Sequence, residues 1–165
     1  MDIGTFDPTT DIVMGKPMRH KQRLTVAFRD KNTNEPFSFV VPAMVTDMDT
    51  KQISLDFELL EQKLEQTLAH VVSHCATHSQ RLFHKDLSEK DIWEHTRPVS
   101  MTLDCSTHFH CDEVSQNVVN NLCECVITLH GYRIVNQELA LFLTVDEVAP
   151  IEEETVFSSY FVADA

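Results

Sequence analysis

The chain has 165 residues, 42% hydrophobic and 24% charged, a composition that fits one globular domain and excludes a disordered chain. Its formal net charge of −13 repels phosphate backbones, so general nucleic-acid binding is not expected. No apolar run approaches the roughly 20 residues of a membrane helix and the first residues show no signal peptide, so we expect no membrane contact and a location in a cytoplasm, a host-cell interior or a virion.

We expect one folded domain between two terminal arms. Residues 1–21 lack hydrophobic periodicity and are interrupted by glycine and proline, so they are predicted to form an irregular N-terminal arm. Residues 22–149 carry the periodic segments of a single α+β domain. Residues 150–165 are predicted to form a C-terminal arm, in which an acidic run precedes a β-prone aromatic segment.

Alternating hydrophobic residues predict two strands at the start of the domain. Residues 24–28 place every second, hydrophobic side chain on one face, which is typical of a half-buried strand. Residues 37–45 repeat the pattern after a polar turn and are predicted to return as a second strand. Residues 53–55 form a short strand or lead directly into the helix that follows.

The clearest helix covers residues 57–82. At about 100° per residue its hydrophobic side chains fall in one stripe, formed by Phe57, Leu60, Leu64, Leu68, Val71, Cys75 and Leu82. A second, short helix is predicted over residues 87–95, with Ser88 near its start and Pro98 beyond its end.

Four further elements complete the expected fold. Residues 99–111 alternate in hydrophobicity, which predicts a strand with one buried and one solvent-exposed face. Residues 113–121 are predicted to form a short helix. Residues 122–135 and 138–148 predict a long hairpin that turns at Asn136-Gln137. The expected fold class is α+β: a mainly antiparallel β-sheet, sandwich or barrel-like, with one long flanking helix and extended N- and C-terminal arms.

Histidine and cysteine patterns give only weak candidates for a metal site. His70, His74 and His78 are one helical turn apart, and an i, i+4 pair can chelate zinc, but they flank the apolar stripe, where polar side chains are common. In the strand expected over 99–111, cysteines and histidines alternate onto opposite faces, so one ion cannot reach both. The five cysteines are an odd count at no framework spacing and are predicted to be free thiols. We therefore expect no metal and no cofactor.

The sequence contains no catalytic motif. Phosphate-binding loops and nucleophile elbows need closely spaced glycines, and the three glycines of this chain, Gly4, Gly15 and Gly131, are far apart. Paired carboxylates occur in turns and tails, where charged residues are usually solvated. We expect a non-enzymatic protein and assign no catalytic or cofactor-binding residue.

Binding of single-stranded nucleic acid, with the acidic tail recruiting partners, is the alternative function. The order of strands and helix is similar in layout to a five-stranded OB-type barrel, a fold that binds oligonucleotides. The aromatic residues that would stack on bases are Phe28, Phe37, Phe39 and Tyr132. All four fall on predicted buried faces, which favours a role in the core.

Charge is distributed unevenly along the chain. Residues 1–31 carry six Lys/Arg against four acidic residues, whereas residues 99–165 carry one Arg against eleven acidic residues. The pattern indicates either an uneven solvated surface or electrostatic complementarity between the start of one subunit and the end of another. The interaction residues that the second reading implies are Lys16, Arg19, Lys21, Glu152, Glu153, Glu154, Val156, Phe157, Tyr160 and Phe161.

The expected function is therefore structural. The chain is predicted to form a homo-oligomer or to dock into a multi-subunit assembly through its arms, with residues 155–162 adding as a strand to a neighbour's sheet edge. The layout is similar to that of building blocks of phage tails and other virion parts, which implies a phage or virion structural protein. The sequence is compatible both with arms that pack on their own domain and with arms that pack on a neighbour.

Overall fold

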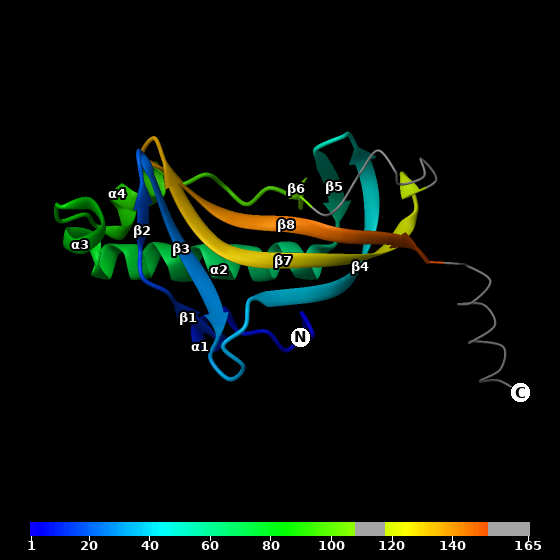
Figure 1. The fold of residues 1–165 in the computed structure, drawn as a ribbon, viewed down its shortest axis with the longest axis horizontal. Coiled ribbons are helices and arrows are strands. Elements are labelled where there is room, and N and C mark those ends of the chain that lie inside the picture. Colours follow the sequence, from blue (N-terminus) through cyan, green and yellow to red (C-terminus); the bar gives the residue numbers. More distant parts are fainter. Residues whose placement is uncertain (108–117, 152–165) are drawn as a thin grey trace, which may run out of the picture.

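A long hairpin and a long helix run side by side along the molecule (Figure 1). The computed structural model describes residues 1–107 and 118–151. In it, β7 (Leu122–Val135) and β8 (Glu138–Pro150) form the hairpin, and α2 (Glu58–Thr77) is the long helix. The other elements are α1 (Pro8–Asp11), β1 (Ile12–Met14), β2 (Met18–His20), β3 (Arg23–Asp30), β4 (Phe37–Met48), β5 (Gln52–Asp56), α3 (Ser79–Phe83), α4 (Glu89–Glu94) and β6 (Thr102–Cys105). The predicted α+β class is confirmed.

Five strands pair in a closed ring, as a barrel-like sheet requires. β4 pairs with β7 and β5, β5 pairs with β6, β6 pairs with β8, and β8 pairs with β7. The pairing of β6 with β8 is parallel and the others are antiparallel. β3 lies outside the ring, where it pairs with the second half of β7 and with β1 and β2. β7 therefore organises the sheet, because β4 and β3 share one of its edges and β8 occupies the other.

The hairpin turns at the two residues that the sequence predicts. Asn136 and Gln137 have φ values of 51° and 65°, and positive φ at both central residues is what a two-residue type I′ turn requires. Pairing then runs from Val135–Glu138 to Cys123–Pro150. The predicted inward rows are confirmed as core residues, with Leu141 half-buried and the others buried: Cys123, Cys125, Ile127, Leu129, Leu139, Leu143 and Val145.

Gly131 allows β3 to lie close to β7. Its φ is 154°, and a Cβ atom built on it would lie 1.9 Å from the carbonyl oxygen of Val26. That separation is well inside van der Waals contact, so only glycine fits without a backbone shift. A register shift between Leu129 and Gly131 accompanies this approach, and beyond it Tyr132 faces the core at 0% exposure.

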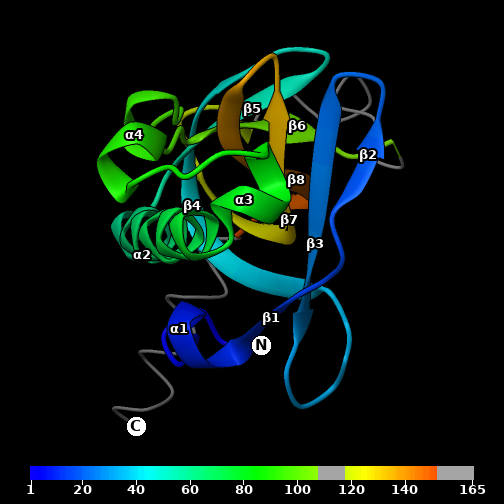
Figure 2. The same ribbon diagram turned by 90° about the vertical axis from the view of Figure 1, so that its left-hand side faces the viewer.

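The long helix lies beside the curved sheet (Figure 2), and its apolar stripe is part of the core. Leu60, Leu64 and Val71 are 0–1% exposed and belong to the same core cluster as the inward rows of the hairpin. Each fully buried side chain of this kind contributes about 1.5–3 kcal/mol relative to exposure. The long helix and the hairpin therefore share one hydrophobic core.

Residues 1–21 do not form the irregular arm that the sequence suggests. α1, β1 and β2 lie within this segment, and β1 and β2 pair with β3. The ring centroid of Phe6 lies 5.1 Å from that of Phe37 and 5.0 Å from that of Phe39, and Phe6 is 1% exposed. Hydrophobic periodicity does not predict this packing, because the elements of this segment are only three or four residues long. Each of them is too short to show a repeating pattern.

Three other elements differ from the prediction. The helix expected over 57–82 ends at Thr77 and resumes as α3, because His78 leaves the helical region with φ −110° and ψ 25°. Within the described residues 99–107 of the strand expected over 99–111, only Thr102–Cys105 is in a strand, and β5 pairs with it over Gln52 to Ser54. Its residues 108–111 lie outside the described residues. Of the helix expected over 113–121, only residues 118–121 are described, and they form a turn.

Candidate functional site

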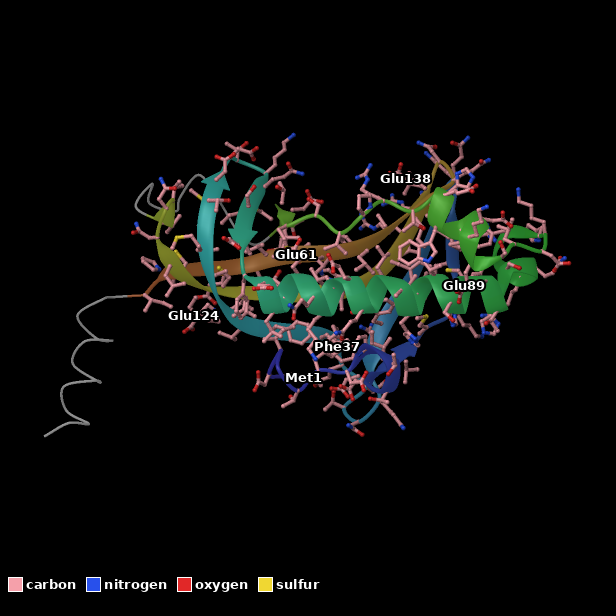
Figure 3. The ribbon with its side chains drawn as sticks, turned by 180° about the vertical axis from the view of Figure 1, so that it is seen from behind. Met1, Phe37, Glu61, Glu89, Glu124 and Glu138 are labelled. Carbon is pink, nitrogen blue, oxygen red and sulfur yellow. The ribbon has the colours of Figure 1, made fainter. Side chains whose placement is uncertain are left out.

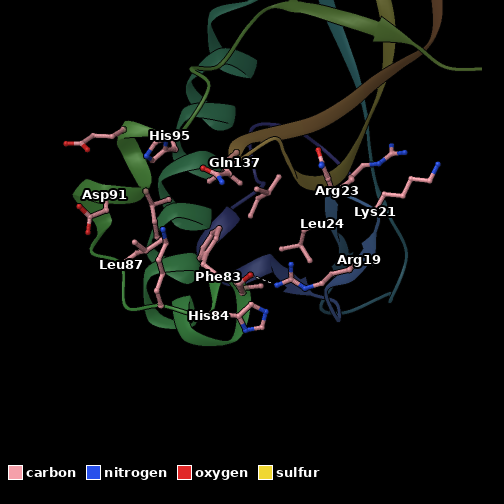
Figure 4. Close-up of a pocket in the computed structure, with 17 residues that line it drawn as sticks. Arg19, Lys21, Arg23, Leu24, Phe83, His84, Leu87, Asp91, His95 and Gln137 are labelled. Atoms are coloured by element: carbon pink, nitrogen blue, oxygen red, sulfur yellow. Dashed lines mark hydrogen bonds between the residues drawn. The ribbon is translucent and has the colours of Figure 1, made fainter.

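A pocket of about 430 Å³ opens at the end of the molecule where the β7–β8 hairpin turns (Figure 4). Its walls come from β2 and β3, from the hairpin turn, and from α3, α4 and the loop between them. The volume lies within the range of about 300–1,000 Å³ of pockets that bind small molecules. The pocket is the candidate site because it gathers basic residues that the sequence singles out.

Most of the charged side chains that line this pocket are cationic. Arg19, Lys21 and Arg23 stand together on one side of it (Figure 4). The lining carries four Lys/Arg against two acidic residues, whereas the whole chain carries 13 against 26. The charged lining residues are Arg19, Lys21, Arg23, Lys85, Asp91 and Glu94. The pocket is therefore locally positive on a strongly negative protein, which favours an anionic ligand.

The remainder of the lining is largely apolar. Phe83 and Leu87 are half-buried and lie across the pocket from Arg23 (Figure 4). The other apolar lining residues are Leu24, Leu82, Ile92, Ile134 and Leu139, all buried. An apolar floor with a cationic rim fits a ligand that has a hydrophobic part and a negative part.

Local hydrogen bonds fix the walls of the pocket. The Arg19 guanidinium donates to the carbonyl oxygen of Leu82, which ties β2 to α3 (Figure 4). His84 ends α3 in the left-handed conformation with φ 61°, so the chain turns toward α4. Ser88 and Asp91 then form a capping box at the start of α4, with 3.2 Å from Asp91 N to Ser88 Oγ. The pocket is therefore largely formed before any ligand enters.

The structure brings together two of the three predicted basic interaction residues. Arg19 and Lys21 line the pocket, whereas Lys16 is exposed between β1 and β2 and is not part of the lining. The other predicted interaction residues lie outside the described residues: Glu152, Glu153, Glu154, Val156, Phe157, Tyr160 and Phe161. Sequence reasoning missed Phe83, Lys85 and Leu87, since no local pattern connects them with residues some 60 positions earlier.

The helix histidines do not form a metal centre within the described residues. The rings of His74 and His78 lie 4.6 Å apart, but no group of three or more His, Cys, Asp or Glu in the described ranges could hold an ion. Burial, helped by His78, Arg81 and His70, lowers the pKa of His74 to about 4. His74 is therefore neutral near pH 7.

One cysteine departs from the expectation of free thiols. Cys105, the last residue of β6, is disulfide-bonded, so the prediction that all five cysteines are free is wrong. Residue spacing could not show this, because a disulfide depends on the distance between two Cβ atoms in the fold. Cys75, Cys123 and Cys125 are free and buried. Burial raises the pKa of Cys75 to about 11 and that of Cys125 to about 12, so both are protonated near pH 7.

The hairpin also carries a polar network that joins its two strands. Asp146 accepts hydrogen bonds from Thr128 and from Thr144, the latter at 3.0 Å, and His130 Nε2 lies 2.8 Å from Thr144 Oγ1. A second pocket, of about 350 Å³, is lined by neighbouring residues but by none of these four. The network therefore fixes the register of the hairpin rather than facing a ligand.

The aromatic residues considered for base stacking are core residues. Phe28, Phe37, Phe39 and Tyr132 are all 0–1% exposed. Burial also raises the pKa of Tyr132 far above its usual value. A base cannot stack on side chains without solvent access, so these four residues do not support nucleic-acid binding.

Comparison of the chain with protein-family models, with curated proteins and with solved structures finds no match. In the part of the chain that the structure describes, no helix is long and apolar enough to cross a membrane. The function is therefore argued from the sequence and from the geometry of the pocket.

Proposed function

We propose that this protein is a structural subunit that self-associates or docks into a larger assembly, and that its C-terminal segment makes the link. The observation that carries the proposal is the polarity of the molecule. The basic pocket lies where the hairpin turns, and the chain leaves the described domain at the other end of the same hairpin (Figure 1). Because the pocket and the start of the C-terminal segment lie at opposite ends of a subunit, contacts between them join subunits head to tail. Such contacts build rings or filaments.

The end opposite the pocket is acidic, which supports this polarity. Glu124 lies there, far from Glu138 at the hairpin turn (Figure 3). Glu147 is exposed on the adjacent strand, and the next charged residues along the chain are Glu152, Glu153 and Glu154. Opposite charge at the two ends steers subunits into a head-to-tail encounter.

The packing of the N-terminal segment supports assigning the link to the C-terminal one. Lys63 Nζ donates to the carbonyl oxygen of Phe6 at 2.6 Å, and the amino group of Met1 donates to the carbonyl oxygen of Ser38 at 3.3 Å. With Phe6 buried in its own domain, this segment presents Arg19 and Lys21 as part of a fixed surface. In the proposal, the N-terminal segment therefore belongs to the receiving side of the contact.

A virion or another particle assembled inside a cell is the proposed setting. Three buried free thiols suit synthesis in a reducing interior. The disulfide at Cys105 suits later exposure to an oxidising medium, such as the surface of a particle.

Analytical ultracentrifugation of the full chain and of a chain ending at Ile151 tests the proposal. The weight-average mass of the full chain is expected to rise with protein concentration. The shortened chain is expected to stay monomeric and to keep the circular dichroism spectrum of the full chain's folded domain. A full chain that is monomeric at every concentration would contradict the proposal, as would a shortened chain that assembles equally well. A single-stranded oligonucleotide added to the full chain should leave its sedimentation unchanged, and a complex would favour the nucleic-acid alternative.

A further inference from the structure

We propose that the basic pocket is the receptor for residues 152–161 of a second copy of this chain. The inference rests on the proposed function and names the surface that receives the C-terminal segment. The segment has the sequence EEETVFSSYF, with an acidic run followed by aromatic residues. The pocket offers the complementary order of features, a cationic rim beside an apolar floor.

Charge complementarity is the first argument for this occupant. Arg19, Lys21 and Arg23 come from one hairpin, β2–β3, and all three are exposed. Three consecutive glutamates at 152–154 supply an equal number of negative charges. Ion pairs at an exposed rim contribute modestly to affinity but strongly to orientation and to the rate of encounter.

The apolar floor is the second argument. Phe83 and Leu87 are half-buried at the pocket, where an entering aromatic side chain would cover them. Phe157 follows the acidic run by three residues, and Tyr160 and Phe161 follow soon after. Aromatic anchors in a pocket beside a polar rim are the usual arrangement of a peptide-binding hot spot.

The free edge of β2 is the third argument. Within the described residues β2 pairs only with β3, so its other edge is open. Arg19 lies in the middle of this three-residue strand. An extended segment that adds to the open edge would form main-chain hydrogen bonds directly beside the cationic rim.

Chain length favours a second copy as the donor, because the acidic run would have to reach the cationic rim. The eleven residues from Leu139, which lines the pocket, to Pro150 span about 36 Å along β8 at about 3.3 Å per residue. From Pro150, a fully extended chain reaches at most about 14 Å at Glu154 and about 25 Å at Phe157. The acidic run therefore falls short of the pocket of its own subunit.

A labelled peptide with the sequence of residues 150–165 tests the assignment directly. Its binding to the chain ending at Ile151 is measured by fluorescence anisotropy. This shortened chain lacks the C-terminal segment, so no segment of another copy competes with the peptide for the pocket. We expect saturable binding that weakens with salt, because exposed charges are screened. Changing Lys21→Glu together with Arg23→Glu is expected to weaken binding by at least about tenfold, since both charges on the rim are reversed.

Matched controls separate the pocket from general electrostatics. Lys31→Glu with Lys51→Glu makes the same change of charge at exposed residues outside the lining, and it should leave binding within about twofold. A peptide in which Phe157, Tyr160 and Phe161 are replaced by alanine keeps every charge and should bind at least about tenfold more weakly. Circular dichroism and thermal unfolding verify that each protein variant is folded.

Three outcomes would overturn the assignment of the pocket. The first is equal weakening of peptide binding by both double substitutions. The second is an absence of peptide binding without binding of decanoate, and the third is an absence of peptide binding with binding of decanoate, which would make the pocket a small-molecule site. If the full chain still assembles through its C-terminal segment, the proposed function survives any of them. If the full chain is monomeric, the proposed function is contradicted whether or not the peptide binds the pocket.

Discussion

Replacing Phe6 by alanine tests whether the N-terminal segment is part of its own domain. Phe6 is 1% exposed and lies 5.0–5.1 Å from the ring centroids of Phe37 and Phe39. Removing a buried phenylalanine costs about 3–5 kcal/mol, of which each aromatic pair accounts for about 0.5–1.5 kcal/mol. A free arm, or an arm exchanged with a neighbour, would leave the stability of the isolated domain unchanged.

Urea denaturation of the chain ending at Ile151, followed by circular dichroism, measures this cost. With a slope of about 2–3 kcal/mol per molar urea, a loss of 3–5 kcal/mol lowers the midpoint by at least about 1 M. The matched control is Met18→Ala in the same segment, because Met18 is 73% exposed and its loss should cost no more than about 0.5 kcal/mol. Equal midpoints for the two variants would refute the packing of Phe6 in its own domain.

Three further predictions concern the described domain. Gly131→Ala should lower the free energy of unfolding by more than about 1 kcal/mol, because its Cβ would clash with the carbonyl oxygen of Val26 at a φ of 154°; an unchanged midpoint in urea would contradict the close approach of β3 and β7. Ser88→Ala should cost about 1 kcal/mol by removing the capping box of α4, and a thermal shift smaller than that of an exposed control such as Thr46→Ala would contradict it. The pKa of His74 is about 4 in the folded chain, against 6.5 for an unperturbed histidine, so below pH 6.5 the unfolded chain binds the proton first and stability falls as the pH drops toward 4. His74→Gln should weaken this dependence, and an unaltered pH profile would contradict the assignment.

The strands and the long helix could be predicted because their signals are periodic and local. The stripe from Leu60 to Cys75 identifies α2, and the alternation around Asn136 and Gln137 identifies the hairpin and its turn. A stripe of hydrophobic residues does not, however, show where a helix breaks. His78 ends α2 through its backbone conformation, and no glycine or proline marks that position.

The closed ring of strands could not be derived from any one segment. The parallel pairing of Asp104 and Cys105 with Thr144 and Val145 joins residues that are 40 positions apart. Alternation over residues 99–111 predicts a longer strand, but the length of a strand also depends on how far its neighbours accompany it. Pairing partners are a property of the whole fold and not of a local pattern.

The candidate site was predictable in its charge but not in its shape. The excess of Lys and Arg among the first residues indicates a basic surface, and Arg19 and Lys21 do line the pocket. Lys16 has the same charge in the same segment and lies outside the lining. What makes the pocket is the meeting of β2 with α3, through the hydrogen bond from Arg19 to Leu82, and that contact joins residues 63 positions apart.

Mixing two defective chains tests the central claim, the head-to-tail link between C-terminal segment and pocket, most directly. One chain is full-length with Lys21→Glu and Arg23→Glu, and the other ends at Ile151 with its pocket intact. Each is expected to sediment alone as a monomer, because one lacks a functional pocket and the other lacks the segment. Their equimolar mixture is expected to form a complex with the mass of two chains, since the intact segment of the first can enter the intact pocket of the second. A mixture that sediments as monomers, while the unaltered full chain self-associates under the same conditions, would contradict the account.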